Sequence, residues 1–337
     1  MAVTLAQAKL NATNDVDLTA VDEFRKSSDV LDKMTFHDTV SGAGNGATLV
    51  YGYNRVTTQA SAAFREIGVE YVAGEAAKTP YTVELKPLGG SFTIDRVLDR
   101  IAASAETTFQ MEQKIKATAA KFHDEFINGD VTVDVNGFDG LSKAITGSST
   151  EYLPLSNGVT TGYIDMSVAT AYDTDAEWNA ILDHIDGFLA LLDGTPDALY
   201  MNSKLKIKLG SIARRAGYWE KSRDEFGRQV DLYNGIPMID LGAKSGSTSP
   251  IVGLFTRDAD AGGAGGNITN LTDLYAVRYG LDGVHGASMS GAPLVQTWLP
   301  DFSTAGAVKT GEVEMGPVAT VLKATKAAAI LRNIKVA

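Results

Sequence analysis

The sequence predicts an α+β fold, because helix and strand patterns alternate irregularly along the chain and no repeat is visible. Two further observations shape this prediction. Alternating apolar and polar residues between positions 48 and 85 are typical of two strands on either side of a charged middle. An apolar stripe at helical spacing, from Ile94 to Phe126, is typical of one long helix.

Composition indicates an ordered protein of one or two intertwined domains. The chain has 337 residues, of which 44% are hydrophobic and 21% charged, close to the average of packed globular proteins. No window approaches the ~18 apolar residues that a membrane span needs, and the first twenty residues do not resemble a signal peptide. We therefore expect no membrane partner, and a protein that acts inside a cell or is released by lysis.

The residue types that are absent or scarce exclude several kinds of site. There is no cysteine, so thiolate nucleophiles, disulfides and cysteine-ligated metals are excluded. The formal charge of −11 argues against direct gripping of nucleic acid, which depends on clustered Lys and Arg. A protein container with a net negative charge can still enclose DNA, because the negatively charged polymer does not adhere to its inner surface.

The first part of the chain predicts an arm followed by a long hairpin. Residues 1–41 are polar and only loosely periodic, as in an arm. Strand patterns at 48–51 and 81–85 then enclose a charged segment, and this predicts a hairpin that lies on a neighbouring subunit, since two uncovered strands are marginal in water.

The long helix is expected to start near Thr93 or Asp95, which are acceptable capping residues, and to end at Asn128 before Gly129. A helix of about 34 residues would be about 50 Å long. Such a helix is a spine rather than a core filler.

After residue 140 the patterns predict a second compact region. A helix is expected from Asp175, and a strand over 198–201 leads to a cap at Asn202 or Ser203. The further segments expected there are a basic helix over 204–215, a turn into a strand over 235–240, a flexible loop over 258–267, and strands over 274–278 and 327–336.

Several of these motifs, in this order, resemble those of the major capsid proteins of tailed bacteriophages. The similar segments are 85–95, 126–130, 138–141, 200–203, 235–237, 275–286 and 327–335. The resemblance implies an N-terminal arm, an extended β-hairpin loop, a spine helix within a peripheral domain, an inserted axial domain, and return strands. The corresponding boundaries are 1–41, 42–92, 93–146, 147–307 and 308–337.

The same resemblance implies a function and a set of partners. Copies of the chain would form hexamers and pentamers of an icosahedral shell that encloses double-stranded DNA without sequence-specific binding. The shell would be assembled in the host cytoplasm and become part of the virion, with a portal and, in some shells, a decoration protein. Because only residues 1–41 precede the hairpin, a separate scaffolding protein is implied. Lys78 and Lys86 could form isopeptide cross-links, but residues 306–325 contain no asparagine, so we expect none.

Chemical sites are not expected. The four histidines are far apart in sequence and are interpreted as structural. Residues 173–177 begin like a calcium loop, but the closing glutamate position holds His184, so helix capping is the better interpretation. Residues 242–245 and 262–266 are interpreted as loops rather than phosphate-binding motifs. We expect no catalytic residue, cofactor or metal, and no enzyme activity.

Charged residues in the hairpin and in the axial domain are the candidates for contacts between subunits, since charge pairs at such rims select partners. The basic helix is interpreted as a solvated or intersubunit face rather than a DNA contact. Two other functions stay open: an encapsulin-like nanocompartment of the same fold, and a soluble α+β enzyme that uses carboxylates. The candidate contact residues are Arg65, Glu66, Glu70, Glu75, Lys78, Arg214, Arg215, Asp224 and Glu225.

Overall fold

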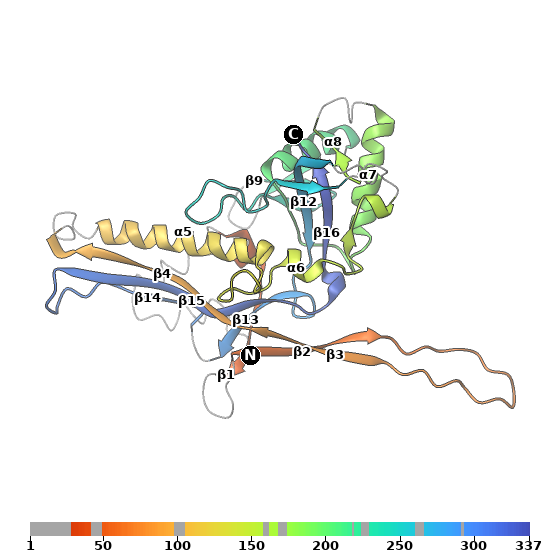
Figure 1. Ribbon diagram of the computed structural model, residues 1–337, viewed down its shortest axis with the longest axis horizontal. Helices are drawn as coiled ribbons and strands as arrows, with labels where there is room; N and C mark the ends of the chain where they lie inside the picture. The colour runs from red at the N-terminus through yellow and green to blue at the C-terminus, as the bar shows by residue number, and fades with distance from the viewer. Residues whose placement is uncertain are drawn as a thin grey trace.

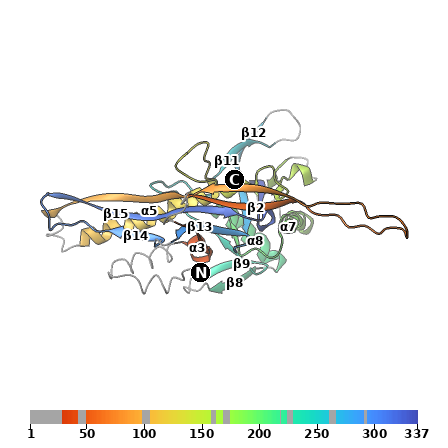
Figure 2. The ribbon, with the colours of Figure 1, turned by 90° about the horizontal axis from the view of Figure 1, so that it is seen from below.

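The protein is an elongated α+β molecule. The computed structural model describes residues 28–41, 49–97, 105–157, 162–167, 174–217, 219–223, 229–259, 266–290 and 293–337. In Figure 1 a long sheet with helix α5 beside it occupies the left and centre, and a second mixed region stands above the sheet's right end. A two-stranded hairpin reaches far to the right, and Figure 2 shows that the sheet and the hairpin share one long axis.

A five-stranded sheet forms the peripheral layer, with β15 at its centre. The strand order is β1-β13-β15-β14, and β4 also pairs with β15. β15 is 15 residues long, and buried positions alternate with exposed ones along its first half, so one face of the sheet is available to a helix. The strands are β1 (Phe36–Ser41), β4 (Lys86–Asp95), β13 (Val284–Ser290), β14 (Val295–Trp298) and β15 (Val308–Leu322).

The spine helix α5 (Ala105–Asn128) packs on this sheet along one apolar stripe. The stripe shares one core with β15, and its members recur at three- and four-residue spacing, which places them on one side of a helix. At 1.5 Å per residue its 24 residues are about 36 Å long. The buried members of the stripe are Met111, Ile115, Ala119, Phe122 and Phe126.

Of the two predicted starts of the spine helix, Thr93 is wrong, because β4 continues to Asp95 and Thr93 pairs with Thr310 of β15. Asp95, the other predicted cap, is followed directly by helical residues 96–97. The glycines at 89 and 90 do not end the extended segment but lie within β4. A side chain at Gly89 would come within 2.3 Å of the Val313 carbonyl oxygen, so the close approach of β4 to β15 requires glycine. The Asp95 carboxylate accepts a hydrogen bond of 2.8 Å from the Val97 amide, as a helix cap does.

Part of the predicted arm belongs to the peripheral core. The short helix α3 (Asp29–Lys33) is followed by β1, which runs parallel to β13, and the hydroxyl of Ser28 caps α3. Val30, Leu31 and Met34 are buried. The remainder of the predicted arm, residues 1–27, lies outside the described residues.

The predicted hairpin is confirmed and consists of β2 (Val50–Thr58) and β3 (Ala77–Glu84). At its base, the Tyr53 hydroxyl donates to the Leu322 carbonyl over 3.1 Å, and Arg55 Nε donates to the Lys323 carbonyl over 3.1 Å. The Arg55 guanidinium also lies 4.4 Å from the centre of the Tyr81 ring. These contacts fix the hairpin to the end of β15.

The second region, the axial domain, is built on a nine-stranded sheet with the order β5-β16-β12-β7-β10-β9-β8, to which β6 and β11 are added. Side chains alternate along β12: Leu274 and Ala276 face the core under α7 and α8, whereas Tyr275 and Val277 join the core of the spine helix. The strands are β5 (Glu151–Tyr152), β6 (Ile164–Asp165), β7 (Ala198–Tyr200), β8 (Trp219–Arg223), β9 (Gln229–Tyr233), β10 (Ile236–Ile239), β11 (Phe255–Asp258), β12 (Asn267–Val277) and β16 (Ala328–Lys335).

Most of the local predictions for this region are confirmed. Helix α8 begins as expected after Asn202, whose side chain accepts a 3.0 Å hydrogen bond from the Lys204 amide. β7, β10, β12 and β16 occupy the predicted strand positions, while residues 260–265 of the predicted loop lie outside the described residues. The sheets divide the chain differently from the expected boundaries: β16 pairs in the axial sheet rather than in the peripheral return of residues 308–337, and β13 and β14 of the expected axial segment pair in the peripheral sheet. The remaining helices are α6 (Leu141–Ile145), α7 (Asp175–Leu189), α8 (Ser203–Ala216) and the 3-10 helices η1 (Leu155–Asn157) and η3 (Thr325–Ala327).

The anchor at the base of the hairpin leads to a first prediction. Replacing Arg55 by Met keeps the length of the side chain but removes its donors to the β15 carbonyls. The free energy of opening of the β2–β3 amides should fall by about 2 kcal/mol, the contribution typical of charged hydrogen bonds. Hydrogen–deuterium exchange of the subunit measures this opening. Arg65→Met is the matched control, and unchanged protection in the Arg55 variant would contradict the anchor.

Candidate assembly surface

A buried carboxylate joins three strands of the axial domain. Asp273 on β12 is 1% exposed and accepts two hydrogen bonds from Arg257 on β11, at 2.7 and 2.8 Å. Arg332 on β16 donates a third, at 3.1 Å. Two guanidinium groups thus compensate one buried charge, and removing the carboxylate would take this ion pair from Arg257 and leave Arg332 paired with Glu151 alone.

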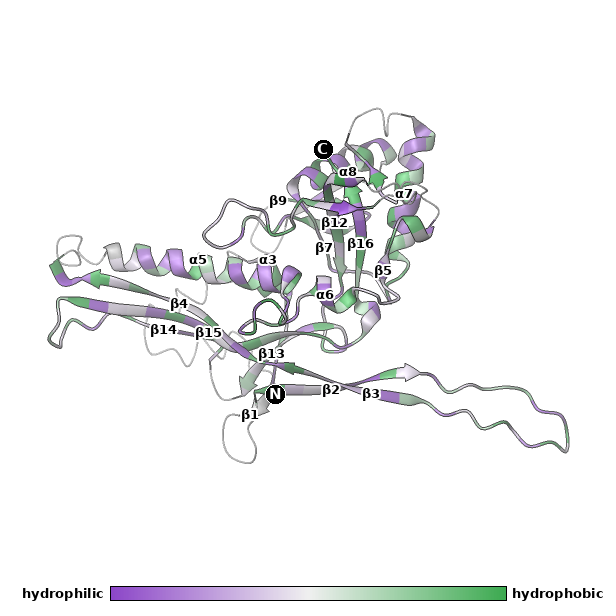
Figure 3. Cartoon of the chain, in the orientation of Figure 1, coloured by the Kyte–Doolittle hydropathy of each residue, from purple (hydrophilic) through white to green (hydrophobic). Residues whose placement is uncertain are grey.

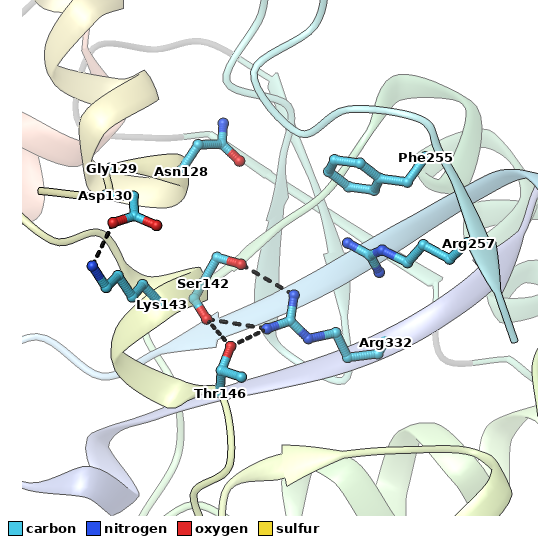
Figure 4. A pocket seen from close by; sticks show the side chains of 9 residues that line it. All are labelled: Asn128, Gly129, Asp130, Ser142, Lys143, Thr146, Phe255, Arg257 and Arg332. Carbon is cyan, nitrogen blue, oxygen red and sulfur yellow. Dashed lines mark hydrogen bonds and ion pairs between the residues drawn. The ribbon is translucent and has the colours of Figure 1, made fainter. Parts of the chain in front are cut away.

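The Arg332 side chain carries this network across to helix α6, which follows the spine helix. It bonds to Glu151 on β5 at 2.8 Å, to the Ser142 carbonyl at 3.0 Å and to the Thr146 hydroxyl at 2.7 Å. Figure 4 shows the Ser142 and Thr146 contacts on one wall of a pocket. The network therefore holds the axial sheet against the end of the spine.

The pocket itself has the size of a ligand site but not the chemistry of one. Its volume is about 540 Å³, within the range of small-molecule sites. Its three cationic side chains, however, are already engaged. Lys143 pairs with Asp130 (Figure 4), and both arginines pair with Asp273. We interpret the pocket as a gap beside a structural network.

The histidines occupy structural environments. His123 on the spine helix is buried and shares a hydrogen bond with the Ser28 hydroxyl, so it ties the segment before β1 to the helix. Burial lowers the pKa of His123 from 6.5 to about 4. His285 on β13 is also buried, and burial together with the neighbouring His37 lowers its pKa to about 4.

Two further observations concern sites that the sequence left in question. Among the described residues, no three His, Cys, Asp or Glu side chains form a group that could hold a metal ion. The segment resembling a calcium loop is a capping box, in which Thr174 and Glu177 bond to each other's backbone amides, as predicted.

In the described ranges, no helix is both long and apolar enough to cross a membrane.

Four of the five candidate contact residues of the hairpin, Arg65, Glu66, Glu70 and Glu75, lie on its uncovered end. Residues 59–76 are exposed throughout and contain a single backbone hydrogen bond, from the Val69 amide to the Glu66 carbonyl. Arg65 shapes the turn by donating to both of these residues' carbonyls at 3.2 Å and lying 5.2 Å from the Tyr71 ring. Lys78 lies at the start of β3, opposite Val56.

Sequence reasoning missed the apolar character of this end. The side chains of Phe64, Ile67 and Val72 are more than nine-tenths exposed, and Val69 and Tyr71 are more than half exposed. Figure 3 shows hydrophobic and hydrophilic positions following one another along the hairpin. The available signal was the density of large apolar residues between 64 and 72, in a segment without a covering layer.

The other candidate contacts lie on the axial domain. Arg214 and Arg215 form the exposed last turn of α8. Figure 1 shows α8 in the region above the long sheet, apart from the hairpin. Asp224 and Glu225 lie outside the described residues. Of the candidates that the structure describes, those of the hairpin and those of α8 are therefore not brought together within one chain.

No protein-family model and no curated protein sequence matches the chain. Solved structures match it over almost its full length. The SrpI encapsulin complex of Synechococcus elongatus PCC 7942 has 14% identity, a TM-score of 0.57, and coverage of 99% of this chain and 96% of that one. The capsid of a native GTA particle has 14% identity, a TM-score of 0.54 and coverages of 91% and 90%.

A structure from Mycobacterium phage Bobi has 13% identity, a TM-score of 0.54, and coverage of 98% of both chains. These similarities show the fold, and the predicted α+β capsid fold is confirmed. The chain has the fold of the major capsid proteins of tailed bacteriophages, which encapsulin shells share.

The Asp273 network leads to a second prediction. Asp273→Asn should lower the free energy of unfolding by about 3 kcal/mol, because Arg257 loses its buried counter-charge and Arg332 keeps only that of Glu151. Urea denaturation of the subunit measures the loss. Asp282→Asn is the control, since Asp282 pairs with Arg278 at the surface and its loss should cause no measurable change. Equal stability of the two variants would refute the structural role of the network.

His123 leads to a third prediction, on the pH dependence of stability. Below pH 6.5 the unfolded chain takes up a proton at His123, whereas the folded protein does so only near pH 4. Acidification therefore favours the unfolded state, and the free energy of unfolding should fall by about 3 kcal/mol between pH 7 and pH 4 through this residue.

The His123→Asn variant keeps a partner for Ser28 but does not titrate, so its stability should depend less on pH in this range. Urea denaturation at a series of pH values tests the difference. His184→Asn is the control, because His184 is only partly buried. A pH dependence unchanged by His123→Asn would exclude this residue as the cause.

Proposed function

We propose that this chain is a major capsid protein that assembles with copies of itself into an icosahedral head shell around a phage genome. The observation that carries the proposal is the uncovered hairpin end, where Phe64, Ile67 and Val72 are almost fully exposed. A single copy gains nothing from displaying these side chains. A neighbouring copy that covers them gains about 1.5–3 kcal/mol for each one buried.

The mechanism is multivalent association into hexamers and pentamers. Hairpins overlap neighbouring copies, axial domains meet around the symmetry axes, and each modest contact becomes effectively intramolecular once the others have formed. Charged groups at the rims of these contacts select the correct partner. The proposed contact residues are Arg65, Glu66, Glu70, Glu75, Lys78, Arg214, Arg215, Asp224 and Glu225.

The proposed function also includes an enclosed genome, further partner proteins and a location. The shell encloses double-stranded DNA without reading its sequence, in keeping with the net charge of −11. A portal, a separate scaffolding protein and, in some shells, a decoration protein are the other partners. The protein is assembled in the host cytoplasm and resides in the virion, and it has no enzymatic role.

An encapsulin-like compartment is the second candidate function. It is supported by the TM-score of 0.57 to the SrpI encapsulin complex, with coverage of almost the whole of both chains. The two candidates differ in what the shell contains. Double-stranded DNA and a portal vertex would favour the phage head, whereas a packaged enzyme would favour the compartment.

Electron microscopy and sedimentation of the purified protein give the fourth prediction. The unaltered chain should form closed shells. The double variant Phe64→Ser with Ile67→Ser should give about tenfold fewer shells or none, because the buried apolar surface at each contact is lost. Its thermal unfolding should be unchanged, since both side chains are exposed in the subunit.

The matched control is Val133→Ser with Val135→Ser, which alters two exposed apolar residues in a turn of the peripheral domain. This variant should assemble normally. If the unaltered chain stays a small oligomer in every assembly condition, the shell function is wrong and the enzyme alternative gains support. If it forms shells but the hairpin variant does so equally well, the hairpin is not the contact.

A further inference from the structure

Helix α7 presents a purely acidic outer face. Between Asp175 and Leu189 it has four Asp or Glu residues and no Lys or Arg. The helix turns its apolar stripe toward the sheet, and at about 100° per residue Asp183 falls opposite this stripe. Asp175 and Asp186 fall beside the stripe, and Asp186 accepts a 3.2 Å hydrogen bond from the Tyr233 hydroxyl. All three aspartates are exposed. This side of the axial domain is therefore negatively charged.

Helix α8 has the opposite character. Between Ser203 and Ala216 it has five Lys or Arg residues and no Asp or Glu. Lys204 and Arg215 are exposed on one face, and Ile207 between them is 68% exposed. An apolar centre with a polar rim is the usual composition of a contact surface.

The two helices lie at different ends of one sheet. Both cover the same face, because their buried residues belong to one core. α7 packs on β16, whereas α8 packs on β8 and β9 near the other end of the strand order. Figure 1 shows α7 on the outer right of the axial domain. The hydroxyl of Tyr233, at the end of β9, reaches α7 with a 3.2 Å hydrogen bond to Asp186. The domain thus has an acidic flank and a basic flank.

We propose that the acidic face of α7 in one copy docks on the basic face of α8 in the next copy around the capsomer axis. This inference rests on the proposed function, because it assigns the partner in the ring. The contact joins two different surfaces, so it repeats head to tail and closes when the rotation between copies fits a ring. It also sets the direction of the ring, since two acidic or two basic flanks repel each other.

The charge pattern favours a second copy over nucleic acid as the occupant of α8. DNA would match the basic face but would leave the acidic flank of α7 without a role. A copy of the same chain satisfies both faces at once and uses Ile207 at the centre of the contact. The pairing is electrostatic at its rim, so concentrated salt should weaken it.

Reversal and exchange of the charges test the pairing. One variant carries Lys204→Glu and Arg215→Glu on α8, and another carries Asp175→Lys and Asp183→Lys on α7. Each alone should reduce the yield of capsomers by about tenfold at low salt, because like charges then face each other. The chain with all four substitutions should assemble like the unaltered protein. Lys326→Glu, at an exposed position in η3, is the control for a simple change in net charge.

A one-to-one mixture of the two double variants gives a sharper result. In an alternating ring every contact again joins opposite charges, so six-membered rings should form. A five-membered ring cannot alternate and keeps one repelling contact, so pentamers should be rare. Native mass spectrometry and negative-stain images count both rings, and circular dichroism and thermal melts verify that each variant folds.

The outcomes separate this inference from the proposed function. Failure of the unaltered chain to form shells would overturn the function itself. Normal shells from it, together with normal capsomers from each double variant, would overturn only the α7–α8 pairing. Normal capsomers from the α8 variant that no longer package DNA would overturn the pairing in favour of a nucleic-acid contact. Lack of rescue in the four-substitution chain, if it folds, would also overturn direct pairing.

Discussion

The hydrogen-bond requirement of β15 is the constraint on which the structure depends. Fifteen residues of backbone donors and acceptors must be paired along two edges. β4 and β14 pair with the first part, and β13 pairs with the second. Where β15 ends, side chains of Tyr53 and Arg55 supply the donors. These hydrogen bonds at the end of β15 set the direction of the hairpin. They therefore also set how far the hairpin extends from the peripheral domain.

Local signals predicted much of this fold. Asn202 caps α8, and Thr174 and Glu177 form the capping box of α7. The apolar stripe of the spine helix can be recognised from the spacing of its own residues. These features depend on neighbours within a few positions, so the sequence contains the information directly. The hairpin was predictable for the same reason, because its two strands are close in the chain.

Features that depend on distant partners were not predictable in this way. Gly89 read alone indicates a break, but β15, more than 200 residues away in sequence, holds it inside a strand. The burial of Leu31 depends on the sheet that covers it. The same distinction applies to the candidate assembly surface. The charged hairpin residues were identified from the sequence, whereas the exposure of Phe64 and the Asp273 network became evident only with the fold.

The uncovered end of the hairpin also bears on the fate of copies that never join a particle. Residues 59–76 form one backbone hydrogen bond and expose large apolar groups, which is the state that proteases cut and that aggregates recruit. A copy covered by its neighbours is shielded from both. Under the proposed assembly, the same segment would mark surplus copies for removal and spare assembled ones, so that the cell's degradation machinery would act as a quality filter without recognising the particle.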